Sequence, residues 1–131
     1  MTINYTKFAT AINCMDGRVQ MPVIEWLKKN YEADYVDMIT EPGPNKILAE
    51  NKDNSTIESI KRRIGISVNK HASKLIAITG HYDCAGNPVE KDTQLKQILL
   101  AIKTIELWNY GIQVIGLWID ENWEVCDVRK G

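Results

Sequence analysis

The 131-residue sequence has no excess of charge of either sign, because 16 Lys and Arg residues stand against 17 Asp and Glu residues. This balance gives no indication of binding to nucleic acid or to an anionic membrane. No apolar run reaches the roughly 18 residues that span a bilayer. The start, MTINYTKFAT, has no basic region followed by an apolar signal core. We therefore expect a cytoplasmic protein whose partners include neither nucleic acid nor a membrane.

Cysteine is also scarce. Three cysteines, an odd number without a secretion signal, indicate reduced thiols rather than a disulfide framework. No C-x-x-C pair is present, which argues against a redox dithiol. The chain contains no internal repeat, low-complexity tract or linker, and its length suits one domain. Residues 1–131 are therefore expected to form a single domain of ordinary soluble composition, with 44% hydrophobic residues.

Short apolar segments predict the strands, at residues 7–13, 35–40, 74–80 and 112–120. The third of these, KLIAITG, is apolar without interruption, which is typical of a parallel strand that is buried on both faces. The segment ENWEVCDV, residues 121–128, is expected to return as a short antiparallel edge strand.

Apolar residues three or four positions apart predict three helices between these strands. The first begins at Pro22 and ends near Tyr31, and the second opens with a capping box formed by Ser55 and Glu58. The third spans residues 92–109. The predicted buried stripes of the second and third helices are Ile57, Ile60, Ile64, Val68 and His71, and Leu95, Ile98, Leu99, Ile102 and Ile105.

This order of elements predicts an α/β fold. We expect a doubly wound, mainly parallel sheet of about four strands in the order 2-1-3-4, one antiparallel edge strand, and helices on both faces. The segment EPGPNK, residues 41–46, is expected to be a loop because two prolines flank its glycine.

Residues that can bind metal follow two of the predicted strands. Cys14, Asp16 and Arg18 come after the first strand, and His81 and Cys84 come after the third. In the order 2-1-3-4 these strands are neighbours at the point where the chain reverses direction, which is where open α/β sheets bind ligands. Two thiolates and one imidazole with an open fourth position are the ligands of a catalytic zinc site. For either cysteine alone, packing as a small hydrophobe is an equally good interpretation.

At these residues the chain resembles the β-class carbonic anhydrases, which pair C-x-D-x-R with a later H-x-x-C; here the motifs read CMDGR and HYDC. The resemblance implies that Cys14, His81 and Cys84 bind one Zn²⁺ per chain, and that Asp16 and Arg18 form a catalytic dyad. It also implies reversible hydration of carbon dioxide to bicarbonate by a zinc-bound hydroxide. The alternatives are hydrolysis of a CO2 analogue such as carbonyl sulfide or carbon disulfide, and a non-catalytic zinc-binding dimer.

The role of Asp16 has two interpretations. It either orients the zinc-bound water, held in place by Arg18, or it binds zinc directly and closes the site, as the equivalent residue does in some family members. The alternative without a catalytic role is that Asp16 and Arg18 form an ordinary ion pair in a loop, which contributes little to stability.

The chain also departs from the family pattern. The family loop R-N-A-G-N corresponds to TEPGPNK here, which keeps Gly43 but lacks the arginine and the first asparagine. Typical members carry an N-terminal helical arm that wraps a partner subunit, whereas about six residues precede the first strand here. The resemblance therefore implies a homodimer with a smaller interface than is typical.

The remaining polar and aromatic residues receive structural interpretations. We expect His71 at the edge of the core, Cys126 packed in the last strand and Glu41 solvated in its loop. Trp108, Trp118 and Trp123 are expected to anchor either the core or a subunit interface. Together with Trp26 they are more large aromatic residues than a small sheet protein needs.

Overall fold

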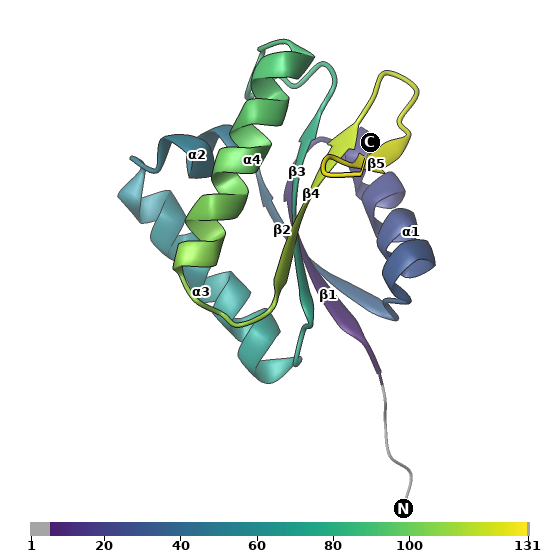
Figure 1. The fold of residues 1–131 in the computed structure, drawn as a ribbon, viewed down its shortest axis with the longest axis vertical. Coiled ribbons are helices and arrows are strands. Elements are labelled where there is room, and N and C mark those ends of the chain that lie inside the picture. Colours follow the sequence, from purple (N-terminus) through teal and green to yellow (C-terminus); the bar gives the residue numbers. More distant parts are fainter. Residues whose placement is uncertain (1–5, 131) are drawn as a thin grey trace, which may run out of the picture.

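The computed structural model describes residues 6–130, which form one sheet with helices on both faces (Figure 1). The sheet has the order β2-β1-β3-β4-β5; its first four strands are parallel, and β5 runs antiparallel to β4. The predicted α/β fold class, strand order and antiparallel edge strand are confirmed. The strands are β1 (Phe8–Cys14), β2 (Tyr35–Glu41), β3 (Leu75–His81), β4 (Gln113–Ile119) and β5 (Val125–Asp127).

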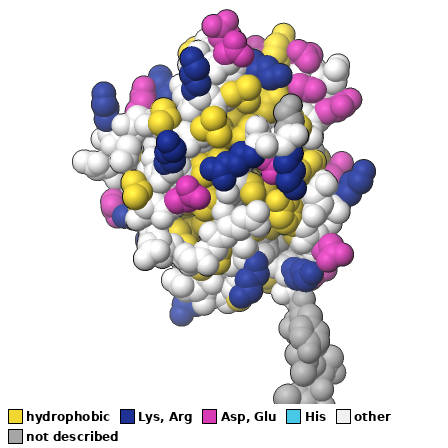
Figure 2. Space-filling model, viewed as in Figure 1, with side chains coloured by type: hydrophobic (Ala, Val, Ile, Leu, Met, Phe, Trp, Pro, Cys, Tyr) yellow, Lys and Arg dark blue, Asp and Glu magenta, His cyan; other side chains and the backbone are white. Residues whose placement is uncertain are grey.

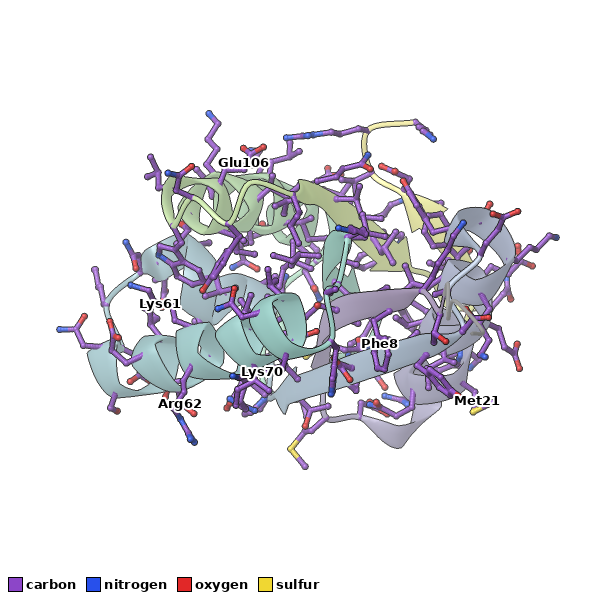
Figure 3. All side chains as sticks on the ribbon, turned by 90° about the horizontal axis from the view of Figure 1, so that it is seen from below. Phe8, Met21, Lys61, Arg62, Lys70 and Glu106 are labelled. Atoms are coloured by element: carbon purple, nitrogen blue, oxygen red, sulfur yellow. The ribbon has the colours of Figure 1, made fainter. Side chains whose placement is uncertain are left out.

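The helices divide unevenly between the two faces of the sheet. They are α1 (Gln20–Tyr31), α2 (Pro44–Glu50), α3 (Asn54–Lys70) and α4 (Lys91–Leu107), and a short 3₁₀ turn, η1 (Gly17–Val19), precedes α1. Side chains of α2, α3 and α4 share one core cluster with the sheet, and side chains of α1 share a second cluster on the other face. Figure 3 shows α3 and α4 on the side of the sheet opposite Met21 of α1.

The apolar patterns of the sequence explain these layers. Every residue of β3 is buried, as its uninterrupted apolar run predicts. The apolar stripe of α3 packs through Ile57, Ile60 and Ile64 into the larger cluster. Among residues 6–130, no helix has the length and apolar character that crossing a membrane requires.

One predicted loop contains a helix. Residues Pro44–Glu50 form α2, so the prediction that residues 41–46 are all loop is wrong. Gly43 takes a left-handed conformation (φ 60°) just before the helix, and Pro44 begins it, since proline is well tolerated in the first turn. Burial of Leu48 in the larger cluster stabilises this short helix. The same loop residues are thereby fixed against the sheet edge.

Two finer predictions are also wrong. The carboxylate of Asp53, not the hydroxyl of Ser55, caps α3, because it accepts a hydrogen bond from the backbone N–H of Thr56 (3.2 Å). Leu99 is 42% exposed instead of buried, since Ala101 takes the core position on α4. In the view of Figure 2, hydrophobic side chains lie between interspersed basic and acidic ones.

Strands β1 and β3 separate towards their carboxyl ends. They pair only from Thr10 to Ile12 on β1 and from Ile76 to Ile78 on β3, although both strands continue further. A side-chain hydrogen bond bridges the widening gap, donated by the Thr79 hydroxyl to Asn13 Oδ1 (2.6 Å). The pairing therefore ends before the carboxyl ends of the two strands, at the point where the chain reverses direction in a doubly wound sheet.

Candidate metal centre

Cys14, His81 and Cys84 meet beside the ends of these two strands. Cys14 ends β1, His81 ends β3, and Cys84 lies in the tight turn that follows. The two sulfur atoms are 3.8 Å apart, and the ligand atoms of all three residues lie within 4.8 Å of one another. All three side chains are buried. The residues that sequence reasoning chose from opposite parts of the chain are therefore brought together.

The imidazole of His81 is oriented for an acceptor role. Its Nδ1–H donates a hydrogen bond to the carbonyl of Tyr82 (2.7 Å), which leaves Nε2 with its lone pair. His81 Nε2 is buried and has no hydrogen-bond partner among the described residues. A buried nitrogen without a partner is unusual. A metal ion beside the two sulfur atoms would satisfy it, so this donor set fits Zn²⁺.

The thiol of Cys14 is poised to ionise. Its pKa is lowered, chiefly because the Cys84 thiol donates a hydrogen bond to the Cys14 thiolate. The backbone N–H groups of Gly43 and Asp16 lower it further, against the opposing effect of burial. A thiolate, not a thiol, is the form that binds metal.

Cys84 is the donor in this pair. Its pKa is raised, chiefly by its hydrogen bond to the Cys14 thiolate and then by burial. The backbone N–H groups of Gly86 and Asn87 act in the opposite direction, since they stabilise a charged Cys84 sulfur. Backbone donors therefore surround both sulfur atoms, and a cation between the sulfurs would favour the loss of the shared proton.

Asp16 and Arg18 form a tight pair beside the cluster. Asp16 accepts hydrogen bonds from the backbone N–H of Arg18 (2.9 Å) and from its Nε and Nη2 (3.1 and 2.7 Å). These contacts, first of all the side-chain hydrogen bond of Arg18, lower the pKa of Asp16 to about 2. The predicted pair is present, and its two-pronged geometry fixes the direction of the carboxylate.

Arg18 is held by two further residues. Its Nη1 lies 3.3 Å from Asp83 Oδ2, and its Nη2 donates to the Asp83 carbonyl (3.1 Å). Its guanidinium carbon lies 4.5 Å from the centre of the Trp123 ring. Trp123 adopts a left-handed conformation (φ 61°) in the turn between β4 and β5. Arg18 therefore links the segment after Cys14 to the segment between His81 and Cys84.

Sequence reasoning missed the roles of Asp83 and Trp123. The position of Asp83 inside H-x-x-C was a usable signal, because it places a carboxylate between two candidate ligands. Nothing in the sequence places Trp123 against Arg18, since that contact depends on how the β4–β5 turn folds over the sheet edge.

Three predictions about single residues also need correction. Glu41 is not a solvated loop carboxylate, because it ends β2 and pairs with Arg63. Cys126 is exposed on β5 instead of packed. His71 follows the end of α3, where it is partly exposed, stacks on Phe8 with ring centres 4.4 Å apart and bonds to Asp37.

Comparisons with known proteins point in one direction. Residues 4–129 match the model of the family described as "Putative carbonic anhydrase". A β-carbonic anhydrase (isoform I) from Trichomonas vaginalis is similar in structure, with a TM-score of 0.63, 14% identity, and coverage of 98% of this chain and 86% of that one. A search of curated proteins found no match.

Two fungal structures are similar as well. One of two tetrameric β-carbonic anhydrases from Sordaria macrospora has a TM-score of 0.52 and 15% identity, with coverage of 93% and 80% of the two chains. The β-carbonic anhydrase CafA from Aspergillus fumigatus has a TM-score of 0.50 and 17% identity, with coverage of 94% and 75%. At these identities the structures support the fold alone.

Proposed function

Because the chain belongs to the carbonic anhydrase family whose model it matches, we propose that it catalyses the zinc-dependent, reversible hydration of carbon dioxide to bicarbonate. The observation that carries this proposal is that two thiols converge with His81 Nε2, which has no hydrogen-bond partner among residues 6–130, at one sheet edge. Cys14, His81 and Cys84 would hold the metal and leave a fourth position open. When bound, Zn²⁺ supplies a Lewis acid that allows water to ionise near neutral pH.

The protein residues then have separate tasks. Asp16, held by three N–H groups of Arg18, would accept a hydrogen bond from the attacking water and direct its lone pair towards the substrate carbon. The contact with Arg18 supports this role over direct zinc binding, since it already engages both carboxylate oxygens of Asp16. The backbone N–H groups of Gly43 and Asp16 would stabilise the charge on the Cys14 sulfur.

A stopped-flow assay on protein of measured zinc content tests the proposed activity. We expect carbon dioxide hydration in proportion to bound zinc, and loss of turnover when a chelator removes the metal. Turnover of carbonyl sulfide without turnover of carbon dioxide would move the assignment to hydrolysis of a sulfur analogue. Bound zinc without turnover of either substrate would make the protein a non-catalytic zinc binder.

Trp123 is expected to support turnover through Arg18. Trp123→Leu removes a cation–π contact worth about 0.5–1 kcal/mol at an exposed site, so turnover should fall roughly 2- to 5-fold, while Trp123→Phe should lose less. Trp26→Leu is the matched control, because Trp26 lines the same surface groove as Trp123 but makes no cation–π contact with Arg18. Equal losses in the Trp26 and Trp123 leucine variants would contradict a role through Arg18.

We also propose a homodimer that buries the surface around this groove. An open groove of about 230 Å³ is lined by Pro22, Trp26, Trp123 and Val125 together with Glu25 and Lys29, and Met21, next to Pro22 in the chain, is 58% exposed. Large apolar side chains gathered at the surface and bordered by charged ones are typical of association sites. The related Sordaria macrospora enzymes are tetrameric, which supports self-association. Light scattering should give about twice 14.9 kDa, and a monomer at micromolar concentration would contradict the proposal.

A further inference from the structure

A cluster of buried amide side chains lies behind the candidate metal centre. Asn45, Asn87 and Gln94 are at most 1% exposed, and Gln97 is bonded to two of them. Burying an amide costs free energy unless hydrogen bonds satisfy it. These four residues come from the start of α2, from the turn after Cys84 and from α4. The cluster therefore ties three separate segments together in the interior.

The side chain of Gln94 forms hydrogen bonds with both backbone groups of His81, the N–H and the carbonyl. Its Oε1 accepts a hydrogen bond from the N–H of His81 (3.2 Å), and its Nε2 donates to the carbonyl of His81 (2.8 Å). His81 lies beyond the β1–β3 pairing, which ends at Ile78. A glutamine amide suits this place because it carries both a donor and an acceptor.

The other amides extend this contact to the start of α2 and to the turn that carries Cys84. Asn45 Nδ2 donates to Gln94 Oε1 and to Gln97 Oε1, each at 3.2 Å, and Asn87 Nδ2 donates to Gln97 Oε1 (2.7 Å). The backbone N–H of Asn87 also donates to the Cys84 carbonyl (3.2 Å). His81 and Cys84 are therefore linked to one buried network.

The residue before His81 has to be small for this network to form. A Cβ atom at Gly80 would lie 2.8 Å from Gln94 Oε1 and 2.9 Å from Asn45 Nδ2. Because real Cβ atoms do not approach other atoms so closely, any side chain at residue 80 would displace the amides. The strand backbone and the amides are thus packed directly against each other.

We infer that Gln94 is a positioning residue for the metal centre, which fixes His81 so that its Nε2 points at the two sulfur atoms. The inference rests on the metal site of the proposed function and assigns that site a second layer of contacts. Side chains that hold a ligand in place typically change metal affinity 10- to 100-fold when they are removed. Gln94→Met keeps a flexible side chain of similar length but removes both hydrogen bonds to His81.

The test measures metal binding and not activity. We expect Gln94→Met to weaken the zinc affinity of the folded protein about 10- to 100-fold. The Co²⁺-substituted protein should show shifted ligand-field bands, because the imidazole would sit in a changed orientation. Gln97→Met is the matched control: it removes contacts to Asn45 and Asn87 but none to His81, so its zinc affinity and cobalt spectrum should change less.

Far-UV circular dichroism shows whether Gln94→Met folds. If it does not, Gln94→Glu takes its place, since a carboxylate of the same shape still accepts from the His81 N–H but cannot donate to its carbonyl. Wild-type zinc affinity and an unchanged cobalt spectrum in the folded variant would overturn the inference, as would equal effects in the Gln97 control. Wild-type protein that binds neither zinc nor cobalt would instead overturn the metal site itself, and the inference with it.

Discussion

Cys84→Ser is expected to lose most of its bound zinc and its turnover. A serine hydroxyl occupies nearly the same space but is a poor ligand beside a thiolate and an imidazole, so the metal would keep two strong protein ligands instead of three. The loss should exceed the roughly 10- to 100-fold effect of removing an outer contact. Metal analysis after purification without chelator, together with a competition titration, measures it.

Cys126→Ser is the control for this experiment. Cys126 is exposed on β5, whereas Cys84 is buried with its sulfur atom 3.8 Å from that of Cys14. The control should keep wild-type zinc content and turnover. Wild-type zinc affinity in Cys84→Ser, or an equal loss in both variants, would show that the sulfur of Cys84 does not bind the metal.

Asp16→Asn should lower turnover roughly a hundredfold while zinc affinity stays near that of the wild type. Positioned proton acceptors typically contribute 10²–10⁴-fold to a rate. An amide fills the space of the carboxylate, but its NH₂ group cannot accept a hydrogen bond from the water and would face the guanidinium of Arg18. Arg18→Ala should act in the same direction, because it releases the carboxylate that three N–H groups now hold. Stopped-flow turnover and zinc titration are measured on the same preparations.

Asp83→Asn is the matched control for Asp16→Asn. Asp83 also pairs with Arg18, but its side chain is largely exposed and its Oδ2 contact is longer (3.3 Å), so only a small effect is expected. Reduced zinc affinity in Asp16→Asn would show instead that Asp16 is itself a ligand. Unchanged turnover and unchanged affinity would reduce the Asp16–Arg18 pair to an ordinary loop ion pair.

The strand order was predictable from the sequence because apolar segments of strand length alternate with helical periodicity along the whole chain. Once β1 and β3 are neighbours, Cys14 and His81 have to share one sheet edge, since both residues end their strands. The convergence of the candidate ligands therefore followed from local patterns and from the rules of parallel sheets.

Other features depend on contacts that no local pattern encodes. Helix α2 begins within a segment whose prolines and glycine are typical of a loop, and it is stabilised by burial of Leu48 and by Thr104, which donates a hydrogen bond to the Leu48 carbonyl (2.9 Å). The two hydrogen bonds between Gln94 and the backbone of His81 join α4 to the end of β3. No pattern in the sequence singled out Gln94, whose side chain is buried.

The most direct test of the account is X-ray absorption spectroscopy of the zinc-loaded wild-type protein. Two thiolates and one imidazole predict two sulfur scatterers at about 2.3 Å and one imidazole nitrogen at about 2.0–2.1 Å, with one further light atom in the open position. Zinc bound only by nitrogen and oxygen, or by a single sulfur, would contradict the assignment of Cys14, His81 and Cys84 as its ligands.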